Sequence, residues 1–575
     1  MIEINEVLLK RNKEWLHFFR PHQVLRAESL REVRDTLREV DNLVNTNGWY
    51  AAGFVSYEAA PAFDNALHVP QGDGFPLLWF GLYPEPLAVE LPTPKESPSV
   101  FSWKASIDRD GYHTAIEKIK DAIASGNTYQ VNYTMRLRTD FDGDEWGFFL
   151  RLAQNQNKYA SFVNTGDHVI CSASPELFFE LDGETITSRP MKGTAKRGRT
   201  TEEDKAQMEW LHHSAKNRAE NVMIVDMIRN DLGRIATTGS VHVPELFGIE
   251  KYPTLFQMTS TVQAKTGASI TEIFSALFPC ASITGAPKVS TMDIISNLET
   301  TPRKIYTGSI GYIAPGRMAQ FNVAIRTAFI DRVKKTAEYG VGGGIVWDST
   351  STDEYSEALL KARVLTEHGR EFSLFETMLW TPDNGYFLLG KHIERMADSA
   401  NYFDFPFSEE EMENSLKQPV HGANTPRRVK ISLDCYGKFS VEVRAVQPAT
   451  KSFRACLAEN PVNSNDPFLF HKTTHREMYD HALVQGYDDV LLFNENDELT
   501  EFTIGNLVVE MDGELLTPPI SCGLLAGTFR SHLLGANQVK EHILHADELQ
   551  KCTKIYLINS VRKWVGVNIS KEPTL

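Results

Sequence analysis

The segment that is most informative about this chain reads Ser188-Arg189-Pro190-Met191-Lys192-Gly193-Thr194. It places a lysine between a proline, whose φ is fixed, and a glycine, whose backbone is permissive. A lysine amine becomes a nucleophile when its pKa is lowered. Lys192 is therefore a candidate catalytic residue, and the rest of the sequence indicates which fold would present it.

Length and charge limit the protein's class. A chain of 575 residues exceeds what one hydrophobic core organises, so two or more domains are expected. The formal net charge of −16 argues against a nucleic acid or membrane partner, because either would require a basic face. There is no signal-like start and no apolar run near the roughly 20 residues that span a bilayer. The 6 cysteines lack metal or redox spacing. These features predict a cytoplasmic protein, in which any anionic substrate would have to be held by local cations.

Polar stretches indicate the domain boundaries. The stretch Thr366–Arg370 follows a helical segment and precedes a new apolar start, so the predicted domains are 1–367 and 370–575. A proline-rich stretch, Leu91–Pro98, predicts a separate N-terminal subregion over 1–95.

The first domain mixes two periodicities. Ile310–Ile313 and Phe321–Ile325 alternate as strands do, while Ala215–Arg234 has apolar residues at helical spacing and a glycine near its end. Strands and helices are therefore both expected in this domain, and the fold class expected for the chain is α+β.

Two predicted helices carry carboxylates. Glu220 lies one turn before an apolar stripe, and the helix Asp353–Lys361 places Glu354, Glu357 and Lys361 on one face. Carboxylates from two helices are suitable ligands for Mg²⁺, which prefers hard oxygen atoms. The alternative is an exposed Glu357–Lys361 pair, which would contribute only a few tenths of a kcal/mol.

Several motifs of the first domain resemble, in order and spacing, a known chorismate-binding domain. It is shared by anthranilate synthase component I, aminodeoxychorismate synthase component I and isochorismate synthases. The matching pieces are Pro279-Cys280-Ala281-Ser282-Ile283-Thr284-Gly285-Ala286-Pro287-Lys288, Arg303, Tyr306, Ile325-Arg326-Thr327, Gly342-Gly343-Gly344 and Lys361. The similarity covers residues 50 to 365. It implies a β-sandwich with flanking helices.

The resemblance also implies roles for individual residues. Arg326 and Lys361 would hold the carboxylates of chorismate, since a dianion requires forked or point-charge donors. The pocket would be completed by Thr284, Tyr306 and the backbone amides of Gly342 and Gly344. Glu220 and Glu357 match metal ligands, and Glu354 matches a carboxylate that acts through water, so Mg²⁺ is the expected ion. Glu176 matches the general acid/base, and desolvation should raise its pKa toward working pH.

Two positions distinguish the members of this family. Isochorismate-type enzymes activate water with a lysine where this chain has Gln130, and anthranilate synthases carry a small residue where it has Lys192. The resemblance is therefore to aminodeoxychorismate synthase, in which the lysine attacks C2, the C4 hydroxyl leaves, and ammonia adds at C4. Because no cysteine lies in a Gly-x-Cys-x-Gly elbow, a separate glutamine amidotransferase subunit is the expected source of ammonia.

The second domain resembles class IV pyridoxal-phosphate enzymes, which include aminotransferases and aminodeoxychorismate lyase. The matching pieces are Phe372–Met378, His392-Ile393-Glu394-Arg395, His471-Lys472-Thr473-Thr474, Gly486–Val490, Leu499–Asn506 and Gly523–Arg530. The resemblance implies a fold of two subdomains and, by analogy, a homodimer through this domain.

Roles for the second domain follow from the same resemblance. Lys472 would bond to pyridoxal 5′-phosphate and later move the proton, while Glu501 would pair with the pyridine nitrogen. Arg395, the amides around Gly527–Phe529 and the Thr528 hydroxyl would bind the phosphate group.

The primary hypothesis is a bifunctional synthesis of 4-aminobenzoate. 4-Amino-4-deoxychorismate would form in the first domain and lose pyruvate in the second. Three alternatives stay open: a second domain without lyase activity, anthranilate synthase component I, and a non-catalytic chorismate-fold scaffold.

Overall fold

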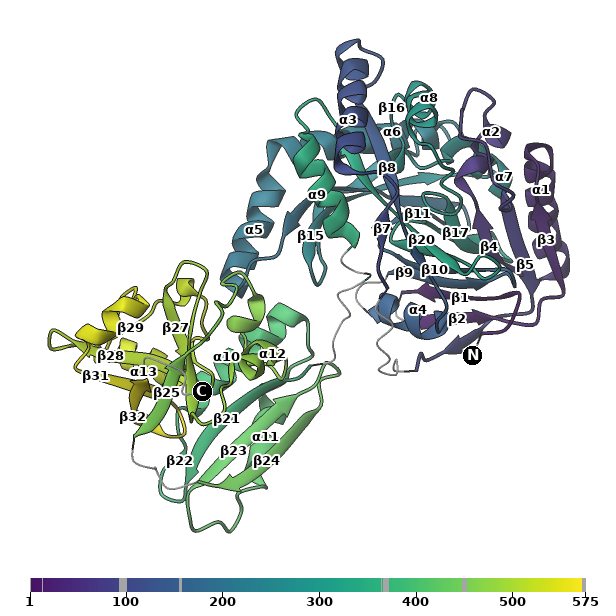
Figure 1. The fold of residues 1–575 in the computed structure, drawn as a ribbon. Helices are drawn as coiled ribbons and strands as arrows, with labels where there is room; N and C mark the ends of the chain where they lie inside the picture. Colours follow the sequence, from purple (N-terminus) through teal and green to yellow (C-terminus); the bar gives the residue numbers. More distant parts are fainter. Residues whose placement is uncertain are drawn as a thin grey trace. The chain divides into compact units, whose positions relative to one another are not determined.

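The computed structural model describes residues 2–12, 14–92, 101–154, 158–362, 365, 372–446 and 452–570. The chain forms two compact units, one of Met1–Lys196 with Met208–Gly369 and one of Arg197–Gln207 with Arg370–Leu575 (Figure 1). The predicted boundary at Thr366–Arg370 lies outside the described residues, as does most of the predicted break at Leu91–Pro98. No described helix is both long and apolar enough to cross a membrane.

The first unit is built on two ten-stranded sheets, counted over the described residues. One sheet has the order β16 (Gly285–Ala286), β8 (Gln130–Asp140), β20 (Thr336–Ile345), β19 (Thr327–Asp331), β10 (His168–Ser174), β9 (Tyr159–Asn164), β1 (Glu6–Arg11), β2 (Glu14–Phe18) and β6 (Leu87–Val89), with β7 (Lys104–Ala105) beside β8. The other has the order β13 (Met191–Lys196), β15 (Leu255–Lys265), β12 (Thr185–Arg189), β11 (Leu177–Asp182), β18 (Met318–Val323), β17 (Ser309–Ala314), β4 (Tyr50–Val55), β5 (Leu78–Tyr83) and β3 (Gln23–Ala27), with β14 (His242–Lys251) beside β15.

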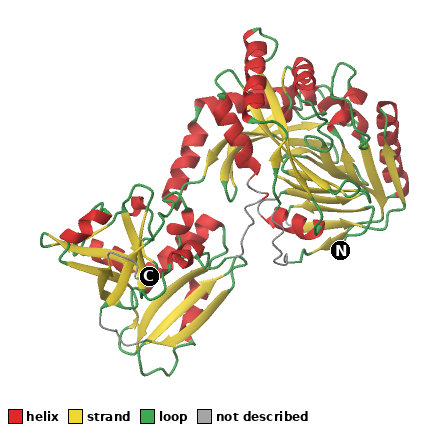
Figure 2. Cartoon of the chain, in the orientation of Figure 1, coloured by secondary structure: helices red, strands yellow, loops and turns green. Residues whose placement is uncertain are grey.

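The two sheets pack face to face. One buried cluster joins Val7 and Ile170 of the first sheet to Phe54 and Ile310 of the second, and none of its buried members comes from a helix. Helices lie outside the paired strands (Figure 2). They are α1 (Leu30–Asn47), α2 (Ala60–Phe63), α3 (Arg109–Ala124), α4 (Glu145–Gln154), α6 (Ala215–Gly233), α7 (Ile270–Leu277), α8 (Lys288–Leu298) and α9 (Ser351–Ala362). The predicted sandwich with flanking helices is confirmed.

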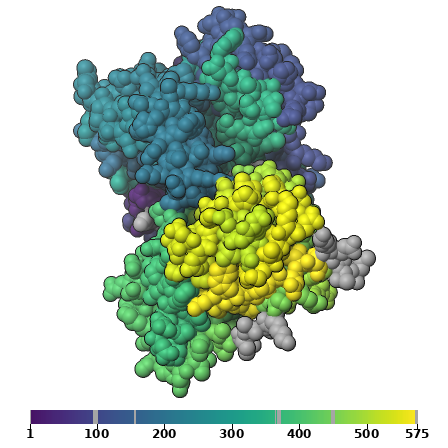
Figure 3. All heavy atoms as spheres, turned by 90° about the vertical axis from the view of Figure 1, so that its left-hand side faces the viewer, coloured from purple at the N-terminus to yellow at the C-terminus, as the bar shows by residue number. Residues whose placement is uncertain are grey.

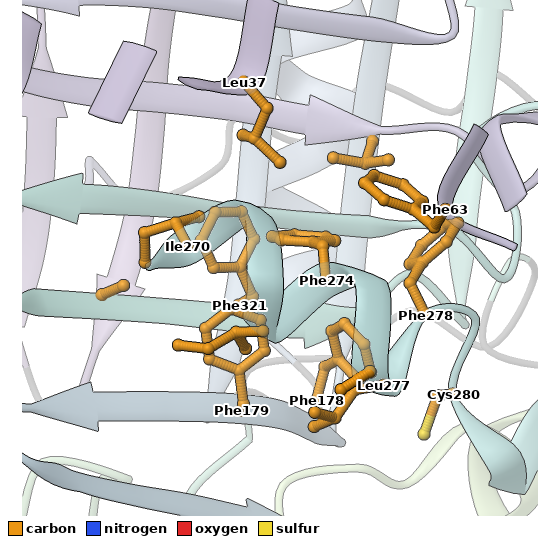
Figure 4. Close-up of a cluster of buried hydrophobic side chains, with 14 of the residues drawn as sticks. Leu37, Phe63, Phe178, Phe179, Ile270, Phe274, Leu277, Phe278, Cys280 and Phe321 are labelled. Carbon is orange, nitrogen blue, oxygen red and sulfur yellow. The ribbon is translucent and has the colours of Figure 1, made fainter. Parts of the chain in front are cut away.

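Apolar spacing explains how a helix covers a sheet here. In α1 the buried residues Val33, Leu37, Val40 and Val44 repeat every three or four positions, which gives one apolar face. A capping box between Ser29 and Glu32 satisfies the first N–H groups of the helix. That face meets an aromatic cluster in which the Phe179 and Phe274 rings each lie 5.1 Å from the Phe321 ring (Figure 4).

The elements predicted in this unit are confirmed. The two predicted strands correspond to β17 and β18, although β18 ends at Val323 rather than at residue 325. The helices predicted over 215–234 and 353–361 correspond to α6 and α9.

The second unit has two subdomains, as predicted. Over the described residues, a four-stranded sheet has the order β22 (Gly385–Tyr386), β21 (Leu374–Thr381), β23 (Arg427–Leu433) and β24 (Phe439–Ala445), and carries α10 (Leu389–Phe403) and α11 (Glu409–Lys417). A second sheet, with eight strands in the described part of the chain, has the order β27 (Leu499–Phe502), β26 (Asp489–Phe493), β25 (Phe453–Leu457), β32 (Lys563–Ser570), β31 (Lys554–Asn559), β28 (Gly505–Met511), β29 (Glu514–Thr517) and β30 (Lys540–Glu541), with α12 (Glu477–Ala482) and α13 (Thr528–Gly535). The two subdomains lie side by side, in green and yellow (Figure 3).

A short segment from the first half of the sequence belongs to the second unit. Arg197–Gln207, which includes the start of α5 (Thr201–His213), follows β13 directly. The Arg197 guanidinium donates to the Tyr402 carbonyl at 2.8 Å, and the Tyr402 hydroxyl donates to the Gly198 carbonyl at 2.7 Å. His471 lies within hydrogen-bond distance of the Arg199 carbonyl, with its Nε2 at 3.2 Å. The sequence did not indicate this exchange, because the segment is polar and has no motif.

Candidate active sites

The first unit encloses a cavity of about 570 Å³. Ten of the residues that the sequence singled out line it: Glu176, Lys192, Glu220, Tyr306, Arg326, Gly342, Gly344, Glu354, Glu357 and Lys361. Thr284 is the exception, because its buried hydroxyl donates to the Cys280 carbonyl at 3.2 Å instead. Segments that are distant in sequence therefore converge on one pocket.

Lys192 is held on β13 by its backbone. The strand pairing between β13 and β15 is irregular between Met191 and Thr194, and Gly193 has a φ of +103°, which favours glycine. A Cβ at Gly193 would also meet the Asn217 Cβ at 3.1 Å. The Asn221 amide donates to the Lys192 carbonyl at 3.2 Å, and so fixes the strand against α6. The segment thus needs the glycine that follows the lysine.

The Lys192 amine itself makes no hydrogen bond to any residue that the structure describes. Burial lowers the pKa of Lys192 from its ordinary value, while the nearby Glu220 carboxylate acts in the opposite direction. A Cβ added at Gly344 would lie 2.3 Å from the Lys192 Nζ and 2.5 Å from the Gln130 Nε2. Because Gly344 in β20 has no side chain, it leaves the space that the Lys192 amine occupies. Neither amide atom of the buried Gln130 has a partner among the described residues.

Glu176 is a buried carboxyl group between β10 and β11. Its backbone is fixed by the Val323 N–H, which donates to the Glu176 carbonyl at 3.1 Å. Burial raises the pKa of Glu176 to about 7, although a hydrogen bond from Ser282 opposes the shift. One carboxyl oxygen, Oε1, has no partner in the described part of the chain. The expected rise in this pKa is confirmed, and the group is suited to give and take a proton near neutral pH.

Two cations of the cavity differ in their partners. The Lys361 amine donates to the Gly342 carbonyl at 2.9 Å and pairs with Glu357 at 2.8 Å. The Arg326 guanidinium has no ion pair within the described ranges and stacks 5.6 Å from the Tyr252 ring. Arg326 also has a φ of +51°, a strained conformation for a residue with a side chain. Arg326 is therefore available to pair with an anionic substrate.

The carboxylates predicted as metal ligands share the cavity but are not gathered. Glu354 accepts from the Ser349 hydroxyl at 2.7 Å, and burial raises its pKa. Lys361 lowers the pKa of Glu357 and occupies one of its oxygens. Across the described residues, no three His, Cys, Asp or Glu side chains stand close enough to hold a metal ion. Mg²⁺ needs only one or two carboxylates when water and substrate oxygens complete its shell, so this donor set fits it once Lys361 moves from Glu357.

The second unit also contains a partly buried lysine, Lys472. Lys472 follows His471, and its carbonyl accepts from the Phe375 N–H at 3.0 Å, which ties it to β21. Burial lowers the pKa of Lys472 to about 7, and the Arg395 charge acts in the same direction. Its amine lies 4.9 Å from the Phe375 ring centre and makes no hydrogen bond to the described residues. An unprotonated buried amine is what bonding to an aldehyde requires.

Glu501 is held by three donors. The Tyr479 hydroxyl reaches its Oε1 at 2.9 Å, the Leu525 N–H reaches the same oxygen at 3.1 Å, and the Asn506 amide reaches Oε2 at 3.0 Å. Burial nevertheless raises the pKa of Glu501 to about 7. A carboxyl fixed by three bonds fits the predicted contact with a pyridine nitrogen.

The two predicted phosphate ligands have partners that the sequence did not indicate. Arg395 forms two hydrogen bonds to the buried Glu376, at 2.8 and 2.6 Å, and one to the Ala526 carbonyl at 3.0 Å. The Thr528 hydroxyl lies 3.2 Å from the His392 Nε2. Glu376 and His392 stand within the Phe-Glu-Thr and His-Ile-Glu-Arg pieces that carried the resemblance, so their motif was visible although their role was not.

Comparisons with known proteins match the two parts of the chain to two different families. A family model described as chorismate binding enzyme matches residues 5–367, and one described as amino-transferase class IV matches residues 373–569. Over 281 residues the chain is 40% identical to aminodeoxychorismate synthase component 1 of Bacillus subtilis, covering 48% of this chain and 59% of that protein. Over 275 residues it is 36% identical to anthranilate synthase component 1 of Aquifex aeolicus, covering 47% and 55%.

One solved structure shows the fold of the first unit. Anthranilate synthase component I from Streptococcus pneumoniae matches with a TM-score of 0.55 and 24% identity, covering 64% of this chain and 94% of that one. The matched part of the chain spans under two thirds of the length of both curated relatives. The predicted resemblances of both parts are confirmed at the level of family and fold.

Proposed function

The chain belongs to the chorismate binding enzymes, and on that premise we propose that it makes 4-aminobenzoate in two steps. The first unit would convert chorismate and ammonia into 4-amino-4-deoxychorismate, and the second would release pyruvate from that product. The observation that carries the first step is a lysine amine with no hydrogen-bond partner among the described residues, in the cavity that also holds an acid of pKa about 7.

In the first step, Arg326 would bind a substrate carboxylate, because its guanidinium has no competing ion pair in the described residues. The Lys192 Nζ would attack C2 of the ring while Glu176 protonates the departing C4 hydroxyl. Ammonia would then add at C4 and the bond to Lys192 would break. Lys192 and Glu176 suit these roles because burial lowers the pKa of the Lys192 amine and raises the pKa of the Glu176 carboxyl to about 7.

Mg²⁺ is proposed as the metal of this site. Glu220 and Glu357 would hold it directly, Glu354 would act through water, and the ion would neutralise the ring carboxylate. The ammonia would come from a separate glutamine amidotransferase subunit, for which the names "component 1" of the relatives give a precedent.

For the second step, pyridoxal 5′-phosphate would supply an electron sink when bound. Lys472 would hold the cofactor and move the C4 proton of the amino substrate. Glu501 would contact the pyridine nitrogen, while Arg395 and Thr528 would bind the phosphate group. This unit is also proposed to form a homodimer. The class IV match supports the cofactor, and the lyase reaction itself is the proposal.

Product analysis by mass spectrometry tests both steps. Wild type with chorismate, ammonium, Mg²⁺ and pyridoxal phosphate should give 4-aminobenzoate and pyruvate. Lys192→Ala should give neither, and Lys472→Ala should accumulate 4-amino-4-deoxychorismate. Anthranilate from the wild type would contradict the first step, and aminodeoxychorismate as the final wild-type product would contradict the second.

Two matched lysine variants serve as controls. Lys265 lies on β15, is exposed, and donates to the Thr185 hydroxyl. Lys430 lies on β23 with its amine 4.5 Å from the Phe375 ring, close to the distance of Lys472 from that ring. Lys265→Ala and Lys430→Ala should keep the wild-type products, so that loss in the test variants reports the position of the amine rather than the removal of a lysine.

A further inference from the structure

A chain of three buried side chains leads away from the proposed phosphate site. Glu376 on β21 and His392 on α10 are 2.6 Å apart, between Oε2 and Nδ1. The His392 Nε2 in turn lies 3.2 Å from the hydroxyl of Thr528, the first residue of α13. All three residues are at most 4% exposed. Among the described residues, the Thr528 hydroxyl therefore has one hydrogen-bond partner, His392.

The charge of Glu376 fixes which ring nitrogen of His392 carries a proton. The charge of Arg395 and the hydrogen bond of His392 hold the pKa of Glu376 at about 2 against the effect of burial, so it is a carboxylate that only accepts. Nδ1 of His392 must then be the donor. In a neutral imidazole the other nitrogen, Nε2, is an acceptor. The single proton of the Thr528 hydroxyl consequently points toward His392 and is not available to a ligand.

Protonation of His392 would reverse this arrangement. An Nε2–H would donate to the Thr528 oxygen, and the Thr528 proton would turn outward. That proton would then be free to reach an anion at the start of α13, where the first backbone N–H groups have no partner within the helix and favour an anion. One proton on the ring thus changes Thr528 from an acceptor into a donor for an anion.

We propose that His392 is a positioning residue that takes up a proton when the phosphate group of the cofactor binds at the start of α13, and so turns the Thr528 hydroxyl toward it. This inference rests on the proposed function, because that function supplies the phosphate. The proton comes from solvent, and no covalent bond to carbon changes.

The charges around His392 agree with a ring that is neutral before the anion arrives. Burial lowers its pKa, Glu376 raises it, and the Arg395 and Lys472 charges lower it. A phosphate group carries close to two negative charges near neutral pH and would add a second nearby anion. Bonding of Lys472 to the cofactor would at the same time alter the Lys472 charge, which is one of the two positive charges that lower the pKa of His392.

Calorimetry in two buffers of different ionisation enthalpy measures the protons taken up when pyridoxal phosphate binds to the full chain. Between pH 7 and 8.5, wild type should take up more protons per cofactor than His392→Gln, by up to about one. Thr528→Val should behave like His392→Gln, and Thr528→Ser should restore the wild-type number. Ionisation of the phosphate and of Lys472 is common to all variants and cancels in the difference.

His532→Gln is the matched control, because His532 is an exposed histidine on the same helix, α13. It should take up as many protons as the wild type. Equal proton uptake by wild type, His392→Gln and Thr528→Val would overturn the inference and leave the proposed function intact. Absence of cofactor binding to wild type, seen as no visible absorbance, would overturn the proposed second step and this inference with it.

Discussion

Gly344 in β20 leaves space for the Lys192 amine, and Gly344→Ala should displace that amine. The new methyl carbon would lie 2.3 Å from the Lys192 Nζ and 2.5 Å from the Gln130 Nε2. Ordinary contact needs about 3.5 Å, so the amine must withdraw by about 1 Å. A misplacement of that size costs about 100-fold in rate, which corresponds to about 2.7 kcal/mol of activation free energy.

The assay is the turnover number for 4-amino-4-deoxychorismate from chorismate and ammonium, with the melting temperature of each variant measured beside it. Both atoms in conflict are ends of flexible side chains, so the melting temperature should change by only a few degrees. Gly566→Ala is the control, since a Cβ at this glycine of β32 meets nothing within 4 Å. A Gly344→Ala enzyme with wild-type turnover would show that Lys192 does not act from this position.

Three further changes test the other groups. Glu176→Gln should lower turnover at least 100-fold, because it removes an acid. In wild type the rate should fall as pH rises through about 7, where the Glu176 carboxyl loses its proton. A pH–rate profile that stays flat up to pH 9 would contradict the role of Glu176 as the acid. Arg326→Lys should raise the KM for chorismate roughly 10- to 100-fold with less effect on kcat, because the planar fork is lost; an unchanged KM would refute the carboxylate contact. Lys472→Met should abolish visible absorbance with pyridoxal phosphate. In the wild-type apoprotein the free energy of unfolding should rise between about pH 7 and 10.5, because in this interval the unfolded state binds more protons at Lys472 than the folded state. Lys472→Met should remove this rise, and denaturant unfolding at pH 7 and 9.5 measures it.

Local patterns were enough to predict much of the first unit. The apolar spacing in α6 and the alternation in β17 and β18 identified each element, because one buried face imposes its period on the residues. The carboxylate face of α9 was visible for the same reason. One boundary differs from the prediction. β18 ends at Val323, two residues before the end of the predicted segment, because the chain leaves the sheet ahead of the strained Arg326.

The sites were predicted as residues but not as contacts. The family resemblance named ten of the residues that line the cavity. Thr284 was named with them, and its hydroxyl donates to the Cys280 carbonyl in its own loop. The spacing left two possibilities for Glu357, a metal ligand or an ion pair with Lys361, and the structure contains the ion pair. Such choices depend on which acceptor is nearest in the folded chain, and neighbours in sequence do not determine that.

By itself the sequence determined two enzyme-like domains, their families and the two lysines, because these depend on residue type, period and motif order within short windows. Only the tertiary structure decided what surrounds each amine. Three features bring together segments that are far apart in sequence. They are the space for the Lys192 amine at Gly344, the hydrogen-bonded chain from Glu376 through His392 to Thr528, and the packing of Arg197–Gln207 in the second unit. Burial, which shifts the pKa values of Glu176 and Lys472, is likewise set by everything packed around a side chain.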